Sequence, residues 1–347
     1  MSRVVVQGLG AVSPAGWGVP ALRTAAEKGE PYPTQLLSRP GWEKQLSVRH
    51  TPGPSPRPAF FAHPRLRRAD AIAQYTVAAA LEALGEDAAR VRNGGSRLGI
   101  VVCVMAGGVA YSRRFYEETL NDPATASPLV FPETVFNAPA SHLAAFLEST
   151  GASYTLVGDD SSFLQGLALA ADWLLNDQAD GCVVVGAEEM DWTVADAMRL
   201  FQRGAIHSDG AGALYLRRGD SSNQAVELVN ITDPFLFTQN QSRTAAAEKM
   251  RAQLPASCPN ELLCASVQGQ PSRDAAENAV WRDWSGSRVA VREIFGEAFP
   301  ATAAWQCVLA CDALQRGKFP AANVSIVGAN LQAIGARFAN PTHRPGA

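Results

Sequence analysis

The chain has 347 residues, 47% of them hydrophobic, and a formal net charge of -3. This length accommodates one large domain or two closely packed halves, and the balanced charge argues against a nucleic-acid partner. No apolar run approaches the roughly 18 residues of a membrane span, and the amino end resembles a buried strand rather than a signal peptide, so we expect a cytoplasmic protein with no membrane span. The six cysteines form no CxxC pair, which predicts neither a disulfide framework nor a metal site.

Short apolar runs alternate with helical patterns along the chain. The runs predict strands buried on both faces at 4–6, 100–104, 182–185, 262–265 and 324–327. The helical patterns cover 69–84, 161–175 and 302–314. This alternation indicates the α/β class. The proline-rich segment 31–68 predicts an irregular surface excursion.

The first predicted strand leads into a pair of glycines like those of dinucleotide-binding turns. Gly8 and Gly10 have the spacing of such a turn, but Pro14 falls where the phosphate-binding helix should already be running. No strand ending in Asp or Glu follows about 20 residues later, as ribose binding would require. The sequence therefore argues against a nicotinamide cofactor.

A polar turn, Asp159 to Ser162, separates a strand from a long apolar helix. Unpaired N–H groups at a helix start favour negative charge, and Asp and Ser are good N-caps, so the turn is either a cap or a nucleophile position. A nucleophile at Ser161 or Ser162 would need a glycine-flanked elbow and a histidine partner, and neither is evident. We expect Asp159 and Asp160 to act as a cap and a polar pocket residue.

Two segments of the chain look duplicated. Residues 169–187 and 309–329 each contain a helix end, a short loop and a buried strand that finishes in Val-Gly-Ala. Related halves would bring the helices that begin near Asp160 and Thr302 to one central site.

Four segments in order resemble the β-ketoacyl-acyl carrier protein synthases of the thiolase fold: "VVVQGLGAVSPAG", "RRADAIAQYTVAAALEAL", "FPETVFNAPASHLAAFLESTGASYTLVGDDSS" and "SDGAGALYL". The resemblance spans nearly the whole chain. It implies two βαβαβαββ halves, 1–217 and 218–347, stacked as five α-β-α-β-α layers. It also implies that no cofactor is bound and that the substrate chain arrives on the phosphopantetheine arm of an acyl carrier protein.

The family's catalytic triad is missing from this sequence. Its cysteine aligns with Asp160, its first histidine with Ser266 and its second with Glu297, while its lysine aligns with Arg292. A carboxylate is a poor substitute for a thiolate that carries an acyl thioester, and Glu297 would repel the enolate that the histidines stabilise. We therefore expect no intact catalytic residue.

The remaining pocket candidates are Asp159, Ser161, Ser162, Phe163, Gly328 and Asn330. A buried carboxylate without a partner is costly, so we expect Arg292 to pair with Asp160 or Glu297 and to fill the degenerate site. The family's glycine-rich turn with its gating phenylalanine is replaced by "VGANLQA".

This pattern resembles the chain-length-factor subunits of bacterial ketosynthase heterodimers, including those of type II polyketide and aryl polyene systems. The resemblance implies a subunit without independent activity that pairs with an active β-ketoacyl synthase and shapes the cavity for polyketide or fatty acyl elongation. Two alternatives stay open. One is a divergent acyltransferase, hydrolase or decarboxylase that uses Asp160, Ser161 or Glu297, and the other is a homodimeric acyl-binding scaffold. Arg65, Arg67 and Arg68 could contact an acidic carrier protein, although a solvated basic surface is the simpler interpretation.

Overall fold

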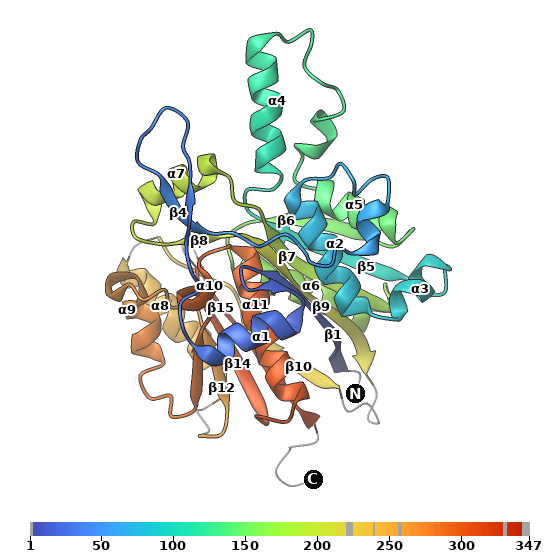
Figure 1. The fold of residues 1–347 in the computed structure, drawn as a ribbon. Helices are drawn as coiled ribbons and strands as arrows, with labels where there is room; N and C mark the ends of the chain where they lie inside the picture. The colour runs from blue at the N-terminus through green and yellow to red at the C-terminus, as the bar shows by residue number, and fades with distance from the viewer. Residues whose placement is uncertain (1–2, 220–224, 239, 256–258, 329–331, 342–347) are drawn as a thin grey trace.

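The computed structural model describes residues 3–219, 225–238, 240–255, 259–328 and 332–341 (Figure 1). Two groups of strands make up the large sheet. The first group has the order β6-β5-β7-β9-β1 and the second has the order β10-β15-β14-β12-β13. An antiparallel pairing of β1 with β10 joins them.

The first group consists of β1 (Arg3–Ser13), β5 (Leu98–Val104), β6 (Ser153–Val157), β7 (Gly181–Glu188) and β9 (Gly210–Gly219). The second consists of β10 (Val226–Ile231), β12 (Leu262–Ala265), β13 (Ser287–Ala290), β14 (Ala321–Val327) and β15 (Gln332–Ala339). In both groups the strand that comes first in the chain lies at one edge beside the last, and the other three are parallel. The same topology therefore occurs twice, as the duplicated segments predicted.

Helices cover both outer faces and fill the space between the two groups of strands. Outside the first group lie α2 (Ala71–Leu84) and α5 (Ala138–Phe146), and outside the second lie α8 (Asn240–Ala252) and α9 (Pro271–Val280). Between the groups lie α6 (Ser162–Leu175) and α11 (Pro300–Gln315), which contact each other and strands of both groups. These are the five layers that the resemblance implied.

The central helix α11 is apolar on all sides, which is typical of a helix enclosed by protein. Every residue from Pro300 to Leu314 is buried. Small residues allow the close approach: a Cβ on Gly212 of β9 would lie 2.7 Å from the Ala304 Cβ. The starts of α6 and α11 are therefore held by the same rigid core.

Segment 31–68 is more ordered than the sequence predicted. It contains β3 (Gln35–Leu37), β4 (Leu46–Arg49) and the short 3-10 helix η1 (Ala59–Ala62). β4 pairs with β8 (His207–Ser208) in a small separate sheet, and Val48 is buried there. Pairing with a distant strand gives this proline-rich stretch its order.

Shorter elements complete the described chain: β2 (Gly16–Trp17), α1 (Val19–Lys28), α3 (Asp87–Arg92), α7 (Trp192–Phe201), β11 (Phe235–Leu236) and α10 (Val291–Phe295). The helix α4 (Val109–Asn121) projects from the body (Figure 1) and buries none of its residues. It packs on the 3-10 helix η2 (Phe131–Glu133), where the Phe115 and Phe131 rings lie 5.4 Å apart. We call residues 109–137 the arm.

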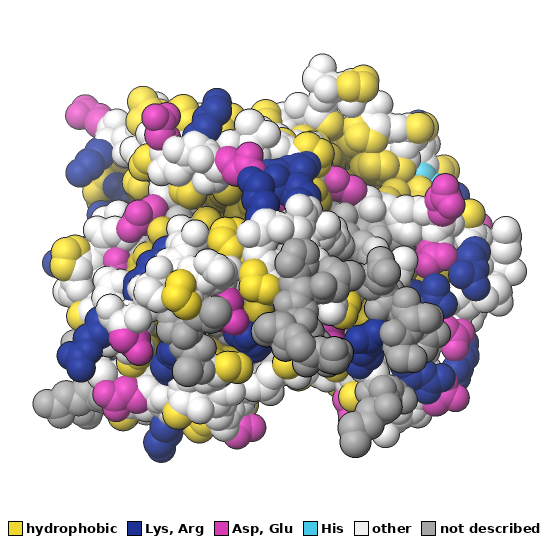
Figure 2. Space-filling view, turned by 90° about the horizontal axis from the view of Figure 1, so that it is seen from below, with side chains coloured by type: hydrophobic (Ala, Val, Ile, Leu, Met, Phe, Trp, Pro, Cys, Tyr) yellow, Lys and Arg dark blue, Asp and Glu magenta, His cyan; other side chains and the backbone are white. Residues whose placement is uncertain are grey.

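Within the described residues, no helix is long and apolar enough to cross a bilayer, and no group of three potential ligands is placed to hold a metal ion. On the face that carries the termini, cationic and anionic side chains are interspersed (Figure 2). This mixture gives the face no uniformly basic surface of the kind that nucleic acids bind.

Candidate functional site

The polar turn lies where β6 ends and the central helix α6 begins. The helix starts at Ser162 with Ser161 as its N-cap residue, one position later than an aspartate cap would require. The backbone N–H of Ser161 donates to Asp159 Oδ1 at 3.2 Å and to Asp160 Oδ1 at 3.1 Å. The Ser161 hydroxyl also donates to Asp159, so the aspartates shape the turn before the helix instead of capping it.

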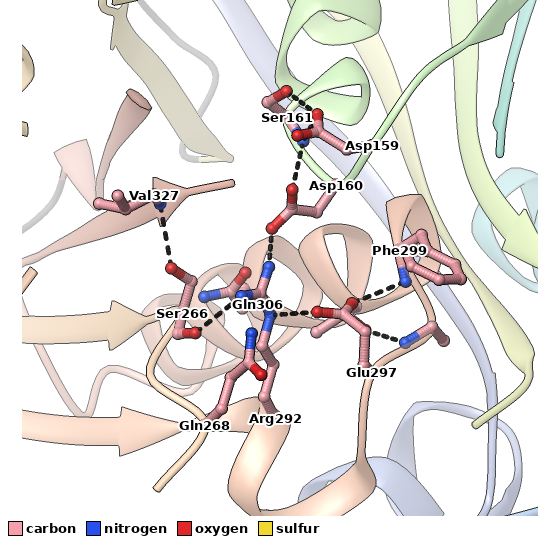
Figure 3. A network of polar contacts seen from close by, with 12 residues as sticks. Asp159, Asp160, Ser161, Ser266, Gln268, Arg292, Glu297, Phe299, Gln306 and Val327 are labelled. Atoms are coloured by element: carbon pink, nitrogen blue, oxygen red, sulfur yellow. Dashed lines mark hydrogen bonds and ion pairs between the residues drawn. The ribbon is translucent and has the colours of Figure 1, made fainter. Parts of the chain in front are cut away.

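Arg292 of α10 extends toward this turn and binds two carboxylates (Figure 3). Its Nη2 forms an ion pair with Asp160 Oδ2, and its Nε lies 3.1 Å from Glu297 Oε2. The side chains of all three residues are only 2% exposed. The prediction that Arg292 pairs with one of the two carboxylates is confirmed, and it pairs with both.

Glu297 has further contacts that fix its carboxylate. Its Oε1 accepts a hydrogen bond from the Phe299 N–H at 2.8 Å. Burial raises the pKa of Glu297, while the positive charge of Arg292 acts in the opposite direction. The negative charge of Asp159 also raises this pKa, because it disfavours a second negative charge nearby.

Ser266, which the sequence resemblance aligned with the family's first histidine, is fully engaged in local hydrogen bonds. Its hydroxyl donates to Glu277 Oε2 at 2.6 Å and accepts from the Val327 N–H at 3.0 Å. Its carbonyl accepts from Arg292 Nη1 at 3.0 Å. The hydroxyl therefore has no hydrogen left to donate to a developing enolate. Sequence reasoning missed Glu277, which binds Ser266 from the second turn of α9.

Gly328 brings the end of β14 directly against the turn. A Cβ at this position would lie 2.5 Å from Asp159 Oδ2 and 3.0 Å from Asp160 Oδ1, so a side chain there would have to displace these carboxylates. Sequence reasoning also missed Gln332, whose amide donates to the Ser161 hydroxyl and accepts from Gln165 Nε2. The predicted pocket residue Asn330 lies outside the described residues.

No described thiol takes the place of the missing cysteine. Cys103 comes near the turn, where its Sγ donates to the Ser162 carbonyl at 3.4 Å, but it is fully buried. Burial raises the pKa of the Cys103 thiol well above its usual range. Ser162 donates its hydroxyl to the Asp159 carbonyl, and Phe163 is buried in the central hydrophobic cluster.

The structure brings one histidine to the site, although none was expected there. His207 of β8 forms an isolated bridge with Glu297, and the Ser208 N–H donates to the Glu297 carbonyl at 2.9 Å. The His207 ring lies beside Phe299, with ring centroids 5.7 Å apart. Burial lowers the pKa of His207 to about 4, so the imidazole is neutral. Sequence spacing could not reveal this contact, which spans 90 residues.

A pocket of about 80 Å³ borders the cluster. Its lining consists of Arg49, Gly204, Ala205, Ile206, Gln268, Arg292, Glu293 and Glu297. This volume is well below the roughly 300–1,000 Å³ of ordinary ligand pockets, so the pocket is too small for an acyl chain. Larger hollows of about 510, 450 and 440 Å³ lie elsewhere on the surface, and none is lined by Asp160 or Arg292.

The family model for the N-terminal domain of β-ketoacyl synthases matches residues 1–221, which is well over half of the chain. The chain belongs to the β-ketoacyl synthase family. No curated protein sequence matches it. The buried Asp160–Arg292–Glu297 cluster consists of residues that the sequence resemblance aligned with the family's catalytic cysteine, lysine and second histidine.

Solved structures with similar folds cover almost the full length of this β-ketoacyl synthase-family chain. The ishigamide ketosynthase/chain length factor has a TM-score of 0.81 and 16% identity, over 97% of this chain and 99% of that one. The AntDE:AntF complex, a type II polyketide synthase acyl carrier protein with its hexaketide-bound ketosynthase, has a TM-score of 0.79 and 18% identity, over 97% and 99%. A β-ketoacyl synthase from Burkholderia phymatum STM815 has a TM-score of 0.75 and 15% identity, over 98% and 100%. These likenesses show the thiolase-like ketosynthase fold.

Proposed function

We propose that the chain is a catalytically silent ketosynthase-like subunit, a chain length factor, that pairs with an active β-ketoacyl synthase and shapes the cavity for polyketide or fatty acyl elongation. One observation carries the proposal. Asp160, Arg292 and Glu297, which the sequence resemblance aligns with the family's nucleophile, lysine and second histidine, form a buried ion-pair cluster.

Condensation by this family needs a thiolate to hold the acyl chain and hydrogen-bond donors at the developing enolate. Asp160 provides no thiol, and its carboxylate is bound to Arg292. The Ser266 hydroxyl is committed to Glu277. Glu297 accepts hydrogen bonds at the position where a donor is required. The cluster therefore opposes the family's reaction at each step.

An open sheet edge supports pairing with a second subunit. Among the described strands, β6 pairs with β5 alone, and its other edge is free. Tyr154 and Val157 on this strand are each 55% exposed. A free edge with apolar side chains favours pairing with another chain. We therefore place the heterodimer contact at the outer edge of β6.

The arm adds further uncovered apolar surface. Leu129 and Phe131 are more than half exposed, and Phe136 is nearly half exposed. Apolar surface of this kind is typical of protein contacts, and interfaces are rich in aromatic residues. The likeness to the ishigamide ketosynthase/chain length factor and to the carrier-protein complex supports the same assembly.

In this proposal the substrate chain stays on the phosphopantetheine arm of an acyl carrier protein and elongates in a cavity formed with the partner. The 80 Å³ pocket beside Arg292 is too small to hold that chain, which favours the partner or the interface as the site of elongation. The chain itself needs no cofactor for this role, and the assembly would work in the cytoplasm.

The test is reconstitution. The chain alone, a Cys-His-His ketosynthase from the same genome alone, and the two proteins together are each given malonyl and acyl groups on a carrier protein. We expect condensation only with the ketosynthase present, and a shift in product length when the chain is omitted. Condensation by the isolated chain would overturn the proposal.

The divergent-enzyme alternative predicts a different result. If Asp160 or Glu297 performs chemistry, then Asp160→Ala and Glu297→Gln abolish product formation by the reconstituted complex. Under our proposal, Glu297→Gln leaves product formation within about twofold of the unaltered complex, because its carboxyl group takes no part in the reaction.

A further inference from the structure

The geometry points to a second role for the cluster: the Arg292 side chain, held by Asp160 and Glu297, is a plug that joins the two halves and closes the passage between the α6 turn and the adjacent pocket. This inference rests on the proposed function, because it states how the silent site is kept closed.

The cluster joins parts of the chain that belong to different halves. Asp160 precedes α6 and follows β6 of the first group of strands. Arg292 lies in the first turn of α10, which follows β13 of the second group, and Glu297 lies just after this helix. The ion pair of Arg292 with Asp160 therefore crosses between the halves, and that with Glu297 holds the guanidinium from its own side (Figure 3).

Arg292 is also placed to block access. It lines the small pocket together with Glu297, while Asp160 lies on the other side of the guanidinium and does not line the pocket. The Asp160 side chain is 2% exposed, as expected for a group shut off from solvent. Arg292 Nη1 also donates to the Ser266 carbonyl, so the guanidinium is held from three directions.

Removing the Arg292 side chain should connect the pocket to the turn. A thiol introduced by Asp160→Cys reports this connection through its rate of alkylation by iodoacetamide, followed by mass spectrometry of the peptide that contains position 160. The variants compared are Asp160→Cys alone, with Arg292→Ala, and with Arg292→Met. The exposed residue Thr150, substituted by cysteine, supplies the rate for an open site.

We expect the Asp160→Cys thiol to react at least 100-fold more slowly than the Thr150→Cys thiol, because Glu297 and the Ser266 carbonyl still hold Arg292 in place. Adding Arg292→Ala should raise the rate at least tenfold, whereas Arg292→Met, which keeps most of the volume, should not. The direction of the rate change distinguishes access from charge, because a nearby cation lowers a thiol pKa and accelerates alkylation. Loss of the charge alone would slow the reaction in both double variants.

Rapid alkylation of the single Asp160→Cys variant, near the Thr150→Cys rate, would overturn the plug. So would equal rates for the Arg292→Ala and Arg292→Met double variants. The comparison of Asp160→Cys with Thr150→Cys still tests the plug if Arg292→Ala fails to fold. Neither outcome contradicts the proposal that the chain is a silent subunit. That proposal is contradicted if the unaltered isolated chain performs condensation.

Discussion

Gly328 packs so closely against the polar turn that a side chain at this position would overlap it. Its backbone lies against the carboxylates of Asp159 and Asp160, and its N–H donates to the Gln332 carbonyl at 2.9 Å. The sequence indicated that Gly328 belongs to the pocket, and it predicted a cation–carboxylate pairing from the cost of burying charge. It could not indicate Glu277, Gln332 or His207, because their contacts with the site depend on how distant elements pack.

Gly328→Ala should destabilise the protein by about 1–3 kcal/mol, because the new methyl group would overlap a buried carboxylate oxygen. Chemical denaturation measures the change. Gly53→Ala is the matched control, since a Cβ there meets no atom within 4 Å. Equal stability of the two variants would show that the turn is looser than described.

Arg292→Ala should cost about 3–5 kcal/mol in unfolding free energy, because it leaves Asp160 and Glu297 buried without a cation. Adding Asp160→Asn and Glu297→Gln should recover part of this loss by removing the uncompensated charges. If the triple variant is no more stable than Arg292→Ala, electrostatics does not explain the cost.

At the scale of elements, the apolar runs and helical patterns identified the strands and helices that hold the site. The predicted helix 302–314 lies inside α11, and the strand at 262–265 has the predicted bounds. The sequence missed β3, β4 and β8, because short strands acquire their order from partners far along the chain. It also gave no sign that α4 projects from the body.

If the ketosynthase binds at the free edge of β6, a substitution on this strand should weaken the complex. Val157→Lys should weaken binding of the ketosynthase at least tenfold, because a lysine on an edge strand discourages strand pairing, while the stability of the isolated chain changes little. Titration calorimetry measures the affinity. Leu236→Lys, at a 74% exposed position on β11, should bind normally. Equal loss of affinity in both variants would contradict the proposed interface.

Buried carboxyl groups at the base of the arm should make the free energy of unfolding depend on pH. Glu188 accepts hydrogen bonds from the Met105 and Ala106 N–H groups just before α4, and its burial raises its pKa from 4.5 to about 8. The negative charge of Glu189, whose pKa burial raises to about 7, adds to the effect. The folded state therefore holds protons that the unfolded chain has lost above pH 4.5.

This contribution to stability is complete below about pH 4.5 and is lost as the pH rises through 8. We expect the unfolding free energy to fall between pH 6 and 8, by up to about 1.4 kcal/mol per pH unit for each proton. Glu188→Gln should reduce the slope, leaving the part due to Glu189. Unfolding curves across this range measure it, and an unchanged slope would show that Glu188 does not titrate there.

At the scale of the whole molecule, the duplicated helix-loop-strand segments correctly predicted a repeated topology around a central pair of helices. The boundary between halves at 217–218 stays a prediction, although the first group of strands ends with β9 at Gly219 and the second begins with β10 at Val226. The proposed partner subunit rests on the resemblance and on the residues that it aligns with the family's triad, because strand patterns do not reveal which edge another chain covers.

The central claim is that acyl chemistry occurs in the partner and not in this subunit. Intact-mass measurement of both subunits, after the reconstituted complex is incubated with an acyl-loaded carrier protein, tests it most directly. Our account predicts an acyl adduct on the ketosynthase and an unchanged mass for this chain. A covalent acyl adduct on this chain, lost on substitution of Asp160 or Ser161, would contradict the account.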